Sequence, residues 1–239
     1  MGDGVGRDGA LPSDELEVLL VRHGETEWNR QGRMQGHQDP PLNDAGAAQA
    51  GVVAQFLASG ACGEVHGVYS SDLRRAAATA HAIAEQCKPA ATSGAVVVDP
   101  AFRERCLGKM EGLTVAEAAV REPEALQRWR SGKLVEGAEA KDVVERRVMG
   151  ALERIATDGL WGRRIVVVTH GGIINCVHRF VEGKPFPGRI ANTSLSTLRL
   201  RDDGGRAKAW RALSFASCPH LAGSSAGKGV GEGGVDWAR

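Results

Sequence analysis

The sequence lacks a long apolar run. No stretch approaches the ~18 consecutive apolar residues of a membrane-spanning helix, and the N-terminus has no basic segment followed by an apolar one, as a secretory signal would have. Cysteines are few: the five are scattered, odd in number and form no Cys-x-x-Cys pair. This pattern indicates reduced thiols instead of a disulfide framework or a zinc site. We therefore expect a cytoplasmic protein without a membrane segment.

A strong excess of charge of either sign is also missing. The 30 Lys and Arg residues are balanced by 29 Asp and Glu residues, so the formal net charge is +1. Such a chain has no broad electrostatic field with which to hold a nucleic acid or an anionic membrane surface. The sequence therefore predicts neither partner, and any anion must bind at a local site. The sequence is compatible with a homodimer.

The two ends of the 239-residue chain differ in composition from the rest. Residues 1–14 are rich in Gly and Asp, and residues 216–239 are rich in Gly and Ser, so both are predicted to be flexible tails. Between them, residues 15–215 alternate strand-like and helix-like segments without an internal repeat. That alternation predicts one α/β domain, long enough to bury a substantial core, in which helices flank a mostly parallel sheet.

Apolar runs and capping residues locate the elements of this domain. Five short apolar runs are the expected strands: Leu16–Val21, Val65–Tyr69, Ala95–Val98, Ile165–Thr169 and Leu195–Leu200. One helix is expected to begin at Asn43 and a second at Ser71 or Asp72, all of them good caps. A third carries an apolar face over residues 144–155, and a fourth spans Gly171–Val181.

Three of the expected strands end in polar and basic side chains. The first ends in "RHGE" at residues 22–25, the second runs into "SDLRR" at residues 71–75, and the fourth ends in "THGG" at residues 169–172. In an open parallel sheet, ligands bind beyond the carboxyl ends of the strands. These three segments can therefore converge, which would place two histidines and two arginines around one small volume.

Such a group of side chains suits a phosphate. A guanidinium forms paired hydrogen bonds to phosphate oxygens, and helices that begin after Gly24 and Gly171 would add backbone N–H groups and a favourable dipole. A histidine among these donors can attack phosphorus, provided that its attacking nitrogen is unprotonated. A backbone acceptor on the other ring nitrogen would enforce that state.

Four motifs in consistent order resemble those of the histidine phosphatase superfamily, also called the phosphoglycerate mutase-like family. They read "RHGETEWN", "SSDLRRAAATA", "RERCLGKMEG" and "VVVTHGG", and the resemblance extends over roughly residues 17–200. It implies the fold of that family, a three-layer α/β/α arrangement with a mostly parallel central sheet.

The resemblance also implies roles for individual residues. It makes His23 the phospho-accepting nucleophile, with Arg22 and Arg75 holding the phosphate, and it selects Arg75 over the neighbouring Arg74. His170 matches the second histidine of the family, which contacts the phosphoryl oxygens and, when cationic, stabilises the charge that develops during transfer. The remaining positions expected to contact the substrate are Asn29, Gln35, Gly36 and Gly171.

Glu104 matches the carboxylate that the family uses as general acid and base, and the chemistry requires such a group. An ester oxygen needs a proton as its P–O bond breaks, and the water that hydrolyses phosphohistidine needs a base. One carboxyl group can serve both steps in turn. Cationic side chains and helix N-termini stabilise the phosphoryl charge, so the sequence predicts no metal ion and no cofactor.

The motifs define the rim of the pocket less well. We expect it to come from residues 32–39 and from residues 112–141, a polar segment that we interpret as an excursion over the sheet edge. That segment carries cations that either meet a substrate carboxylate or form a solvated helix face: Arg121, Arg128, Arg130 and Lys133. Ala140 replaces a serine of the family and cannot cap the following helix. His220 marks a C-terminal segment that folds over the pocket in some family members.

The same motifs occur in phosphatases and in mutases. Cofactor-dependent mutases carry a long insertion between the acid motif and the second histidine, whereas Glu104 and His170 have the shorter, phosphatase-like spacing. We therefore predict a metal-independent phosphomonoesterase of the histidine acid phosphatase type, which hydrolyses a small phosphorylated metabolite. A cofactor-dependent phosphoglycerate mutase and a non-catalytic phosphate-binding protein on the same fold are the alternatives.

Overall fold

The computed structural model describes residues 11–202 and 209–221. In this part of the chain, a six-stranded sheet has the order β3-β2-β4-β1-β5-β6. Its strands are β1 (Glu15–Arg22), β2 (Gly67–Ser70), β3 (Val96–Val98), β4 (Arg164–Thr169), β5 (Leu195–Arg201) and β6 (Ala209–Ser217). The pairs among β1, β2, β3 and β4 are parallel, and β5 and β6 add two antiparallel pairs at one side. The sheet is mostly parallel, as the sequence predicts.

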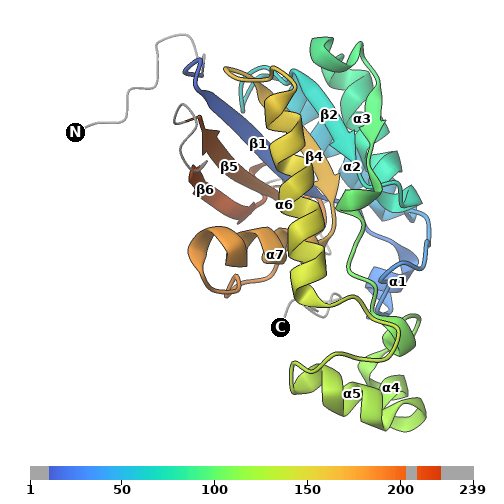
Figure 1. Ribbon diagram of the computed structural model, residues 1–239. Coiled ribbons are helices and arrows are strands. Elements are labelled where there is room, and N and C mark those ends of the chain that lie inside the picture. Colours follow the sequence, from blue (N-terminus) through green and yellow to red (C-terminus); the bar gives the residue numbers. More distant parts are fainter. Residues whose placement is uncertain (1–10, 203–208, 222–239) are drawn as a thin grey trace.

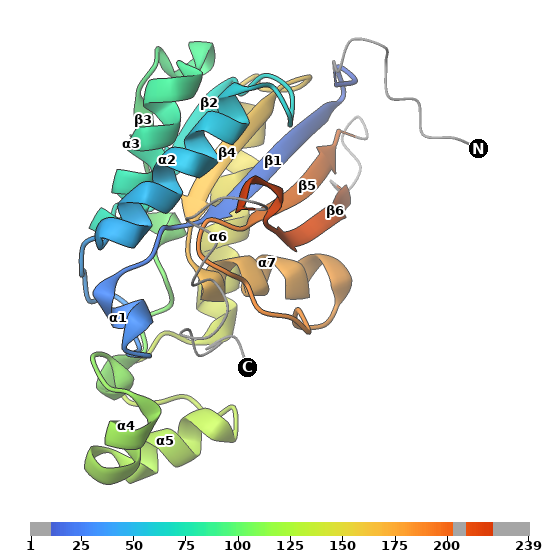
Figure 2. The same ribbon diagram turned by 180° about the vertical axis from the view of Figure 1, so that it is seen from behind.

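Helices cover both faces of the sheet, which gives the expected three-layer α/β/α fold (Figures 1 and 2). The pair on one face is α2 (Asp44–Ala58) and α3 (Arg74–Cys87); the pair on the other is α6 (Lys141–Thr157) and α7 (Gly171–Glu182). Because both faces are covered, β1 and β4 are buried and apolar at nearly every position. None of the described helices is both long and apolar enough to span a bilayer.

The five expected strands are present to within two residues at each end, but β6 was not predicted. It pairs with β5 at the edge of the sheet and is only partly buried, so its sequence lacks a strong apolar alternation. A short 3₁₀ helix, Pro219–Leu221, follows it. The predicted tail from residue 216 therefore begins too early. Residues 1–10 and 222–239 of the two predicted tails lie outside the described residues.

Two short helices, α4 (Val115–Arg121) and α5 (Pro123–Arg130), protrude beyond α1 (Glu27–Arg30), well away from the sheet (Figure 1). A small apolar cluster that includes Met34, Met110 and Leu126 packs this unit together. The edges of the sheet are formed by β3 and β6. The interpretation of residues 112–141 as an excursion over the sheet edge is therefore wrong.

The helix caps were predicted with mixed success. The cap of α2 is confirmed, because Asn43 Oδ1 accepts the Gly46 N–H at 2.8 Å. The expected caps of α3 are not used: the helix begins without a side-chain cap, since Ser71 hydrogen-bonds to another element and Asp72 is held in an ion pair. Ala140 gives α6 no side-chain cap, as expected.

Candidate active site

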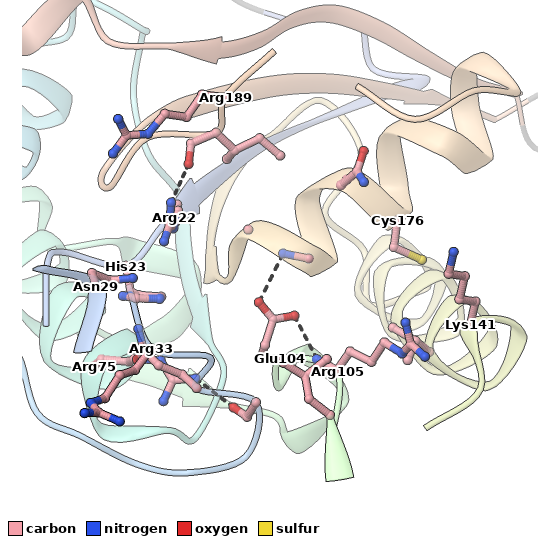
Figure 3. A pocket seen from close by; sticks show the side chains of 18 of the residues that line it. Arg22, His23, Asn29, Arg33, Arg75, Glu104, Arg105, Lys141, Cys176 and Arg189 are labelled. Carbon is pink, nitrogen blue, oxygen red and sulfur yellow. Dashed lines mark hydrogen bonds between the residues drawn. The ribbon is translucent and has the colours of Figure 1, made fainter. Parts of the chain in front are cut away.

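A pocket opens where β1, β2 and β4 end, and it gathers the predicted site residues (Figure 3). Eight of the nine line it: Arg22, His23, Asn29, Gln35, Gly36, Arg75, Glu104 and Gly171. The ninth, His170, is completely buried, with its ring centroid 5.1 Å from that of His23. Residues that are far apart in the sequence thus form one site.

His23 is held as a neutral imidazole with a free nitrogen. Its Nδ1 lies 2.7 Å from the Gly24 carbonyl oxygen; because a carbonyl can only accept, Nδ1 carries the proton and Nε2 keeps its lone pair. Burial, followed by the charges of Arg75 and Arg22, holds the pKa of His23 well below its usual range. His23 is therefore a neutral imidazole at neutral pH, with the unprotonated Nε2 that a nucleophile needs.

The backbone around His23 is fixed by hydrogen bonds from three sides. The His23 N–H donates to the Thr169 carbonyl at 2.9 Å, and Asn192 Nδ2 donates to the His23 carbonyl at 2.9 Å. The Gly24 N–H donates to Thr79 Oγ1 at 3.0 Å. The prediction that a helix after Gly24 offers N–H groups to a phosphate is therefore wrong: that N–H is occupied, and α1 begins only after Thr26, which caps it.

Arg75 lies fully buried beneath the pocket. Its two terminal nitrogens donate to the carbonyl oxygens of Gln38 and Gly36, at 2.8 and 2.9 Å, and its Nε has no hydrogen-bond partner. Burial lowers the pKa of Arg75 to about 10, so the side chain is still a cation at neutral pH. Since Arg74 is exposed, the structure places Arg75, as predicted, in the pocket.

Asn29 presents an amide whose oxygen is already bound. Its Oδ1 accepts the Thr26 N–H at 3.1 Å and the Thr26 hydroxyl at 3.0 Å. Arg22, which also lines the pocket, donates from Nη1 to the Ile190 carbonyl at 2.5 Å. The Asn29 Nδ2 donor and the Arg22 guanidinium are therefore both oriented by neighbours and can receive an anion between them.

His170 is bound on one side only. Its Nε2 lies 2.9 Å from Ser71 Oγ, and its Nδ1 is buried without a hydrogen-bond partner. Burial, then the charge of Arg75, holds the pKa of His170 well below its usual range. Burial and nearby cations thus favour a neutral His170 in the free protein, and its role as a cation during transfer stays a prediction.

The Glu104 carboxylate faces the pocket from the side opposite His23 (Figure 3). Its Oε1 accepts the Arg105 N–H at 2.8 Å, and its Oε2 accepts the Gly172 N–H at the start of α7, at 3.1 Å. A Cβ on Gly172 would lie 2.4 Å from Oε1, so only glycine lets the carboxylate come this close. The position of Glu104 is thus set by α7 as well as by its own loop.

Arg147 holds the Glu104 loop and was missed by the sequence analysis. It donates to the carbonyls of Ala101, Arg103 and Glu104 at 2.6 to 3.1 Å and forms an ion pair with Glu139 at 2.9 Å. These carbonyls lie 43 to 46 positions away in the chain, so no local pattern in the sequence marks Arg147.

The rim of the pocket differs from the prediction. Segment 32–39 contributes as expected, but Lys141 is the only residue of segment 112–141 among those that line the pocket. The four cations expected there lie outside it: Arg121, Arg128, Arg130 and Lys133. The lining contains seven cationic side chains and one carboxylate, Glu104; the cations that no motif identified are Arg33, Arg105, Lys141, Arg179 and Arg189.

His220 does not cover the pocket. Its Nε2 lies 3.1 Å from Thr193 Oγ1, and its ring contacts that of Phe56 on α2 at a centroid distance of 5.8 Å. Burial lowers the pKa of His220 to about 4. The C-terminal segment that the structure describes is therefore packed against α2, and His220 is not among the pocket-lining residues.

Comparisons with known proteins agree with this geometry. A family model described as "Histidine phosphatase superfamily (branch 1)" matches residues 18–213. Two Arabidopsis thaliana proteins are similar. A metal-independent phosphoserine phosphatase is 36% identical over 88% of this chain and 87% of its own, and a phosphoglycerate mutase-like protein 4 is 41% identical over 79% of this chain and 81% of its own. The structure of a mycobacterial glucosyl-3-phosphoglycerate phosphatase superimposes with a TM-score of 0.69 and 30% identity, over 84% of this chain and 99% of that one.

Proposed function

The chain belongs to the histidine phosphatase superfamily, and from that premise we propose that it is a metal-independent phosphomonoesterase acting on a small phosphorylated metabolite through a phosphohistidine. The observation that carries this proposal is the neutral His23, whose Nδ1 is bound to the Gly24 carbonyl, with the buried Arg75 and the half-buried Arg22 beside it and Glu104 facing it. Phosphatases among the relatives and structural neighbours support the reaction class.

In the first step, the Nε2 lone pair of His23 attacks phosphorus. The P–N bond forms as the P–O ester bond breaks, and the carboxylic acid form of Glu104 gives its proton to the departing oxygen, so that an alcohol leaves. Arg22 and Arg75 hold the phosphoryl oxygens, whose charge they oppose. The Nδ1 of His23 becomes positively charged in this step, and the Gly24 carbonyl that it contacts stabilises that charge.

In the second step, a water molecule hydrolyses the phosphohistidine. The Glu104 carboxylate, formed in the first step, takes a proton from water while the water oxygen bonds to phosphorus. The P–N bond breaks, and its electron pair returns to Nε2 of His23. Inorganic phosphate leaves, and both residues are restored to their starting protonation states.

The proposal is tested with protein treated with EDTA. We expect it to hydrolyse p-nitrophenyl phosphate at the rate of untreated protein, and His23→Ala to abolish this activity, while His81→Ala, at an exposed position outside the pocket, leaves it intact. Loss of activity on chelation would contradict metal independence. Phosphate binding without turnover would favour the non-catalytic alternative.

A mutase is the second candidate, because one of the similar proteins is named a phosphoglycerate mutase-like protein. The two reactions share the phosphohistidine and differ in its acceptor, which is water in a phosphatase and a substrate hydroxyl in a mutase. Assays with 3-phosphoglycerate, with and without 2,3-bisphosphoglycerate, separate them. We expect phosphate release both with and without the bisphosphate. Isomerisation that the bisphosphate stimulates, without phosphate release, would establish the mutase.

A further inference from the structure

Beyond Glu104, the pocket continues to a second group of cations (Figure 3). Arg105 follows the catalytic carboxylate, Lys141 is the first residue of α6, and Arg179 belongs to α7. Figure 3 shows Arg105 and Lys141 on the side of Glu104 that faces away from His23. The phosphate pocket described above does not need these three side chains.

The positive charge of this group is poorly compensated within the described residues. Lys141 has no carboxylate within 4.0 Å, and Arg105 donates its Nε to a neutral partner, the Glu139 carbonyl, at 2.8 Å. Arg179 has one ion pair there, with Glu145 at the long distance of 3.6 Å. Cations held side by side in this way repel one another and attract an anion.

The pKa shifts agree with that geometry. Burial, then the charges of Arg179 and Arg105, lowers the pKa of Lys141. Burial also lowers the pKa of Arg105; Glu104 and Glu139 oppose this effect, and Arg179 adds to it. An anion bound among the three cations would offset the repulsion between them.

We propose that Arg105, Lys141 and Arg179 form a subsite for a second anionic group on the leaving-group side of the substrate. This inference rests on the proposed function, because it places the ester oxygen next to Glu104. One pocket is lined both by these three cations and by His23, Arg22 and Arg75, so both groups face the same cavity. The subsite selects phosphate esters that carry a carboxylate or a second phosphate.

The test compares esters that differ in this second group. Glycerol 3-phosphate has none, 3-phosphoglycerate has a carboxylate, and fructose 1,6-bisphosphate has a second phosphate. We expect kcat/KM to be at least about tenfold higher for one of the doubly anionic esters than for glycerol phosphate, because a charge-assisted hydrogen bond contributes that much. The two arms identify which anion the subsite prefers.

Variants of Lys141 connect the preference to the subsite. Lys141→Met should lower the ratio of the two kcat/KM values several-fold, and Lys141→Arg should retain it. Lys133→Met is the matched control, since Lys133 is exposed and does not line the pocket. Equal kcat/KM values in the wild type, or an unchanged ratio in Lys141→Met, would overturn the inference.

Failure of this inference is distinguishable from failure of the proposed function. Wild-type protein that hydrolyses p-nitrophenyl phosphate but shows no preference among the three esters contradicts the subsite alone. Should turnover be absent, the affinities of glycerol phosphate and 3-phosphoglycerate for His23→Ala, measured by calorimetry with and without Lys141→Met, test the subsite separately. Equal affinities for the two esters overturn it.

Discussion

His23 and His170 are both neutral in the free protein because burial and two nearby arginines oppose their protonation. For His23 this state leaves a lone pair for attack. For His170 it leaves a neutral ring whose Nε2 contacts Ser71 Oγ and whose Nδ1 has no hydrogen-bond partner. The permanent positive charge beside the two histidines therefore comes from Arg22 and Arg75.

Glu104→Gln should separate the two chemical steps. p-Nitrophenolate leaves without a proton, so this variant should release a burst of product, roughly one equivalent per site, and then turn over about 10²- to 10⁴-fold more slowly for lack of a base. Glycerol phosphate, whose alkoxide needs the proton, should give no burst. Rapid-mixing absorbance and phosphate assays measure both. If Glu104→Gln hydrolysed either ester at the wild-type rate, the role of Glu104 would be contradicted.

Arg75→Ala should reduce kcat/KM by about 10²- to 10³-fold, as expected for removal of one donor to a developing charge. It should also destabilise the protein, because the carbonyls of Gln38 and Gly36 lose their buried donors. Arg74→Ala, one residue earlier and exposed, is the control and should change stability by no more than about 0.5 kcal/mol. Similar losses in both variants would contradict the assignment.

The sequence was informative about residues with a local signal. Residues such as His23 and Arg75 follow expected strands within recognisable motifs, and the order of the strands explains why they meet. Arg147 and Asn192 support the site through contacts with segments far away in the chain. No spacing rule within a single element reveals such contacts, so they could not be predicted.

At the scale of elements, a close contact between two glycines joins the loop after β1 to α2. A Cβ on Gly24 would lie 2.4 Å from the Gly46 carbonyl oxygen, and a Cβ on Gly46 would lie 2.0 Å from the Glu25 carbonyl oxygen. Backbone atoms cannot move away as a flexible side chain can. The approach of α2 therefore sets the position of the loop that carries His23.

Gly46→Ala should thus reduce both stability, by about 1 to 3 kcal/mol, and phosphatase activity. Gly51→Ala is the matched control in the same helix: a Cβ at Gly51 has no atom within 4 Å, so this change should stabilise α2 by about 0.5 to 1 kcal/mol. Urea unfolding measures both. A neutral Gly46→Ala variant would contradict the close packing of α2 on the loop.

The elements themselves were predicted where burial leaves a strong pattern. β1 and β4 are covered on both faces and read as continuous apolar runs. β6 lies at the edge and has no such pattern. Ser71 and Asp72 are good caps in isolation, but tertiary partners take them over, so the start of α3 could not be placed from local preference.

At the scale of the whole molecule, stability should depend on pH through buried histidines. The pKa values of His23, His170 and His220 are lowered on folding, the last to about 4. The unfolded chain therefore binds more protons than the native one below the ordinary histidine pKa of about 6.5, and stability decreases as pH falls through that value.

Thermal unfolding between pH 7.5 and pH 5 checks this prediction. We expect the melting temperature to be constant above about pH 7 and to fall steadily below about pH 6.5. His220→Gln removes one of these three histidines, and His220 lies outside the pocket. This variant should therefore show a smaller decrease of melting temperature per pH unit. A melting temperature that is constant or rises toward pH 5 would contradict the neutral state of the buried histidines.

The overall charge gave no indication of how charge is distributed. A chain with a formal net charge of +1 has seven cations and one carboxylate lining its pocket. Several of those cations, such as Arg179 and Arg189, come from segments without a motif. Composition predicts no broad charged surface, but it could not reveal this local concentration, which depends on how distant segments meet.

The nucleophilic role of His23 is tested most directly by trapping the phosphoenzyme. Glu104→Gln protein is mixed with p-nitrophenyl phosphate, quenched in alkali and analysed by peptide mass spectrometry. We expect an acid-labile phosphate on the peptide that contains His23, at close to one equivalent, and none after His23→Ala in the same background. Product release without a phosphopeptide, or a phosphate on another residue, would contradict the mechanism.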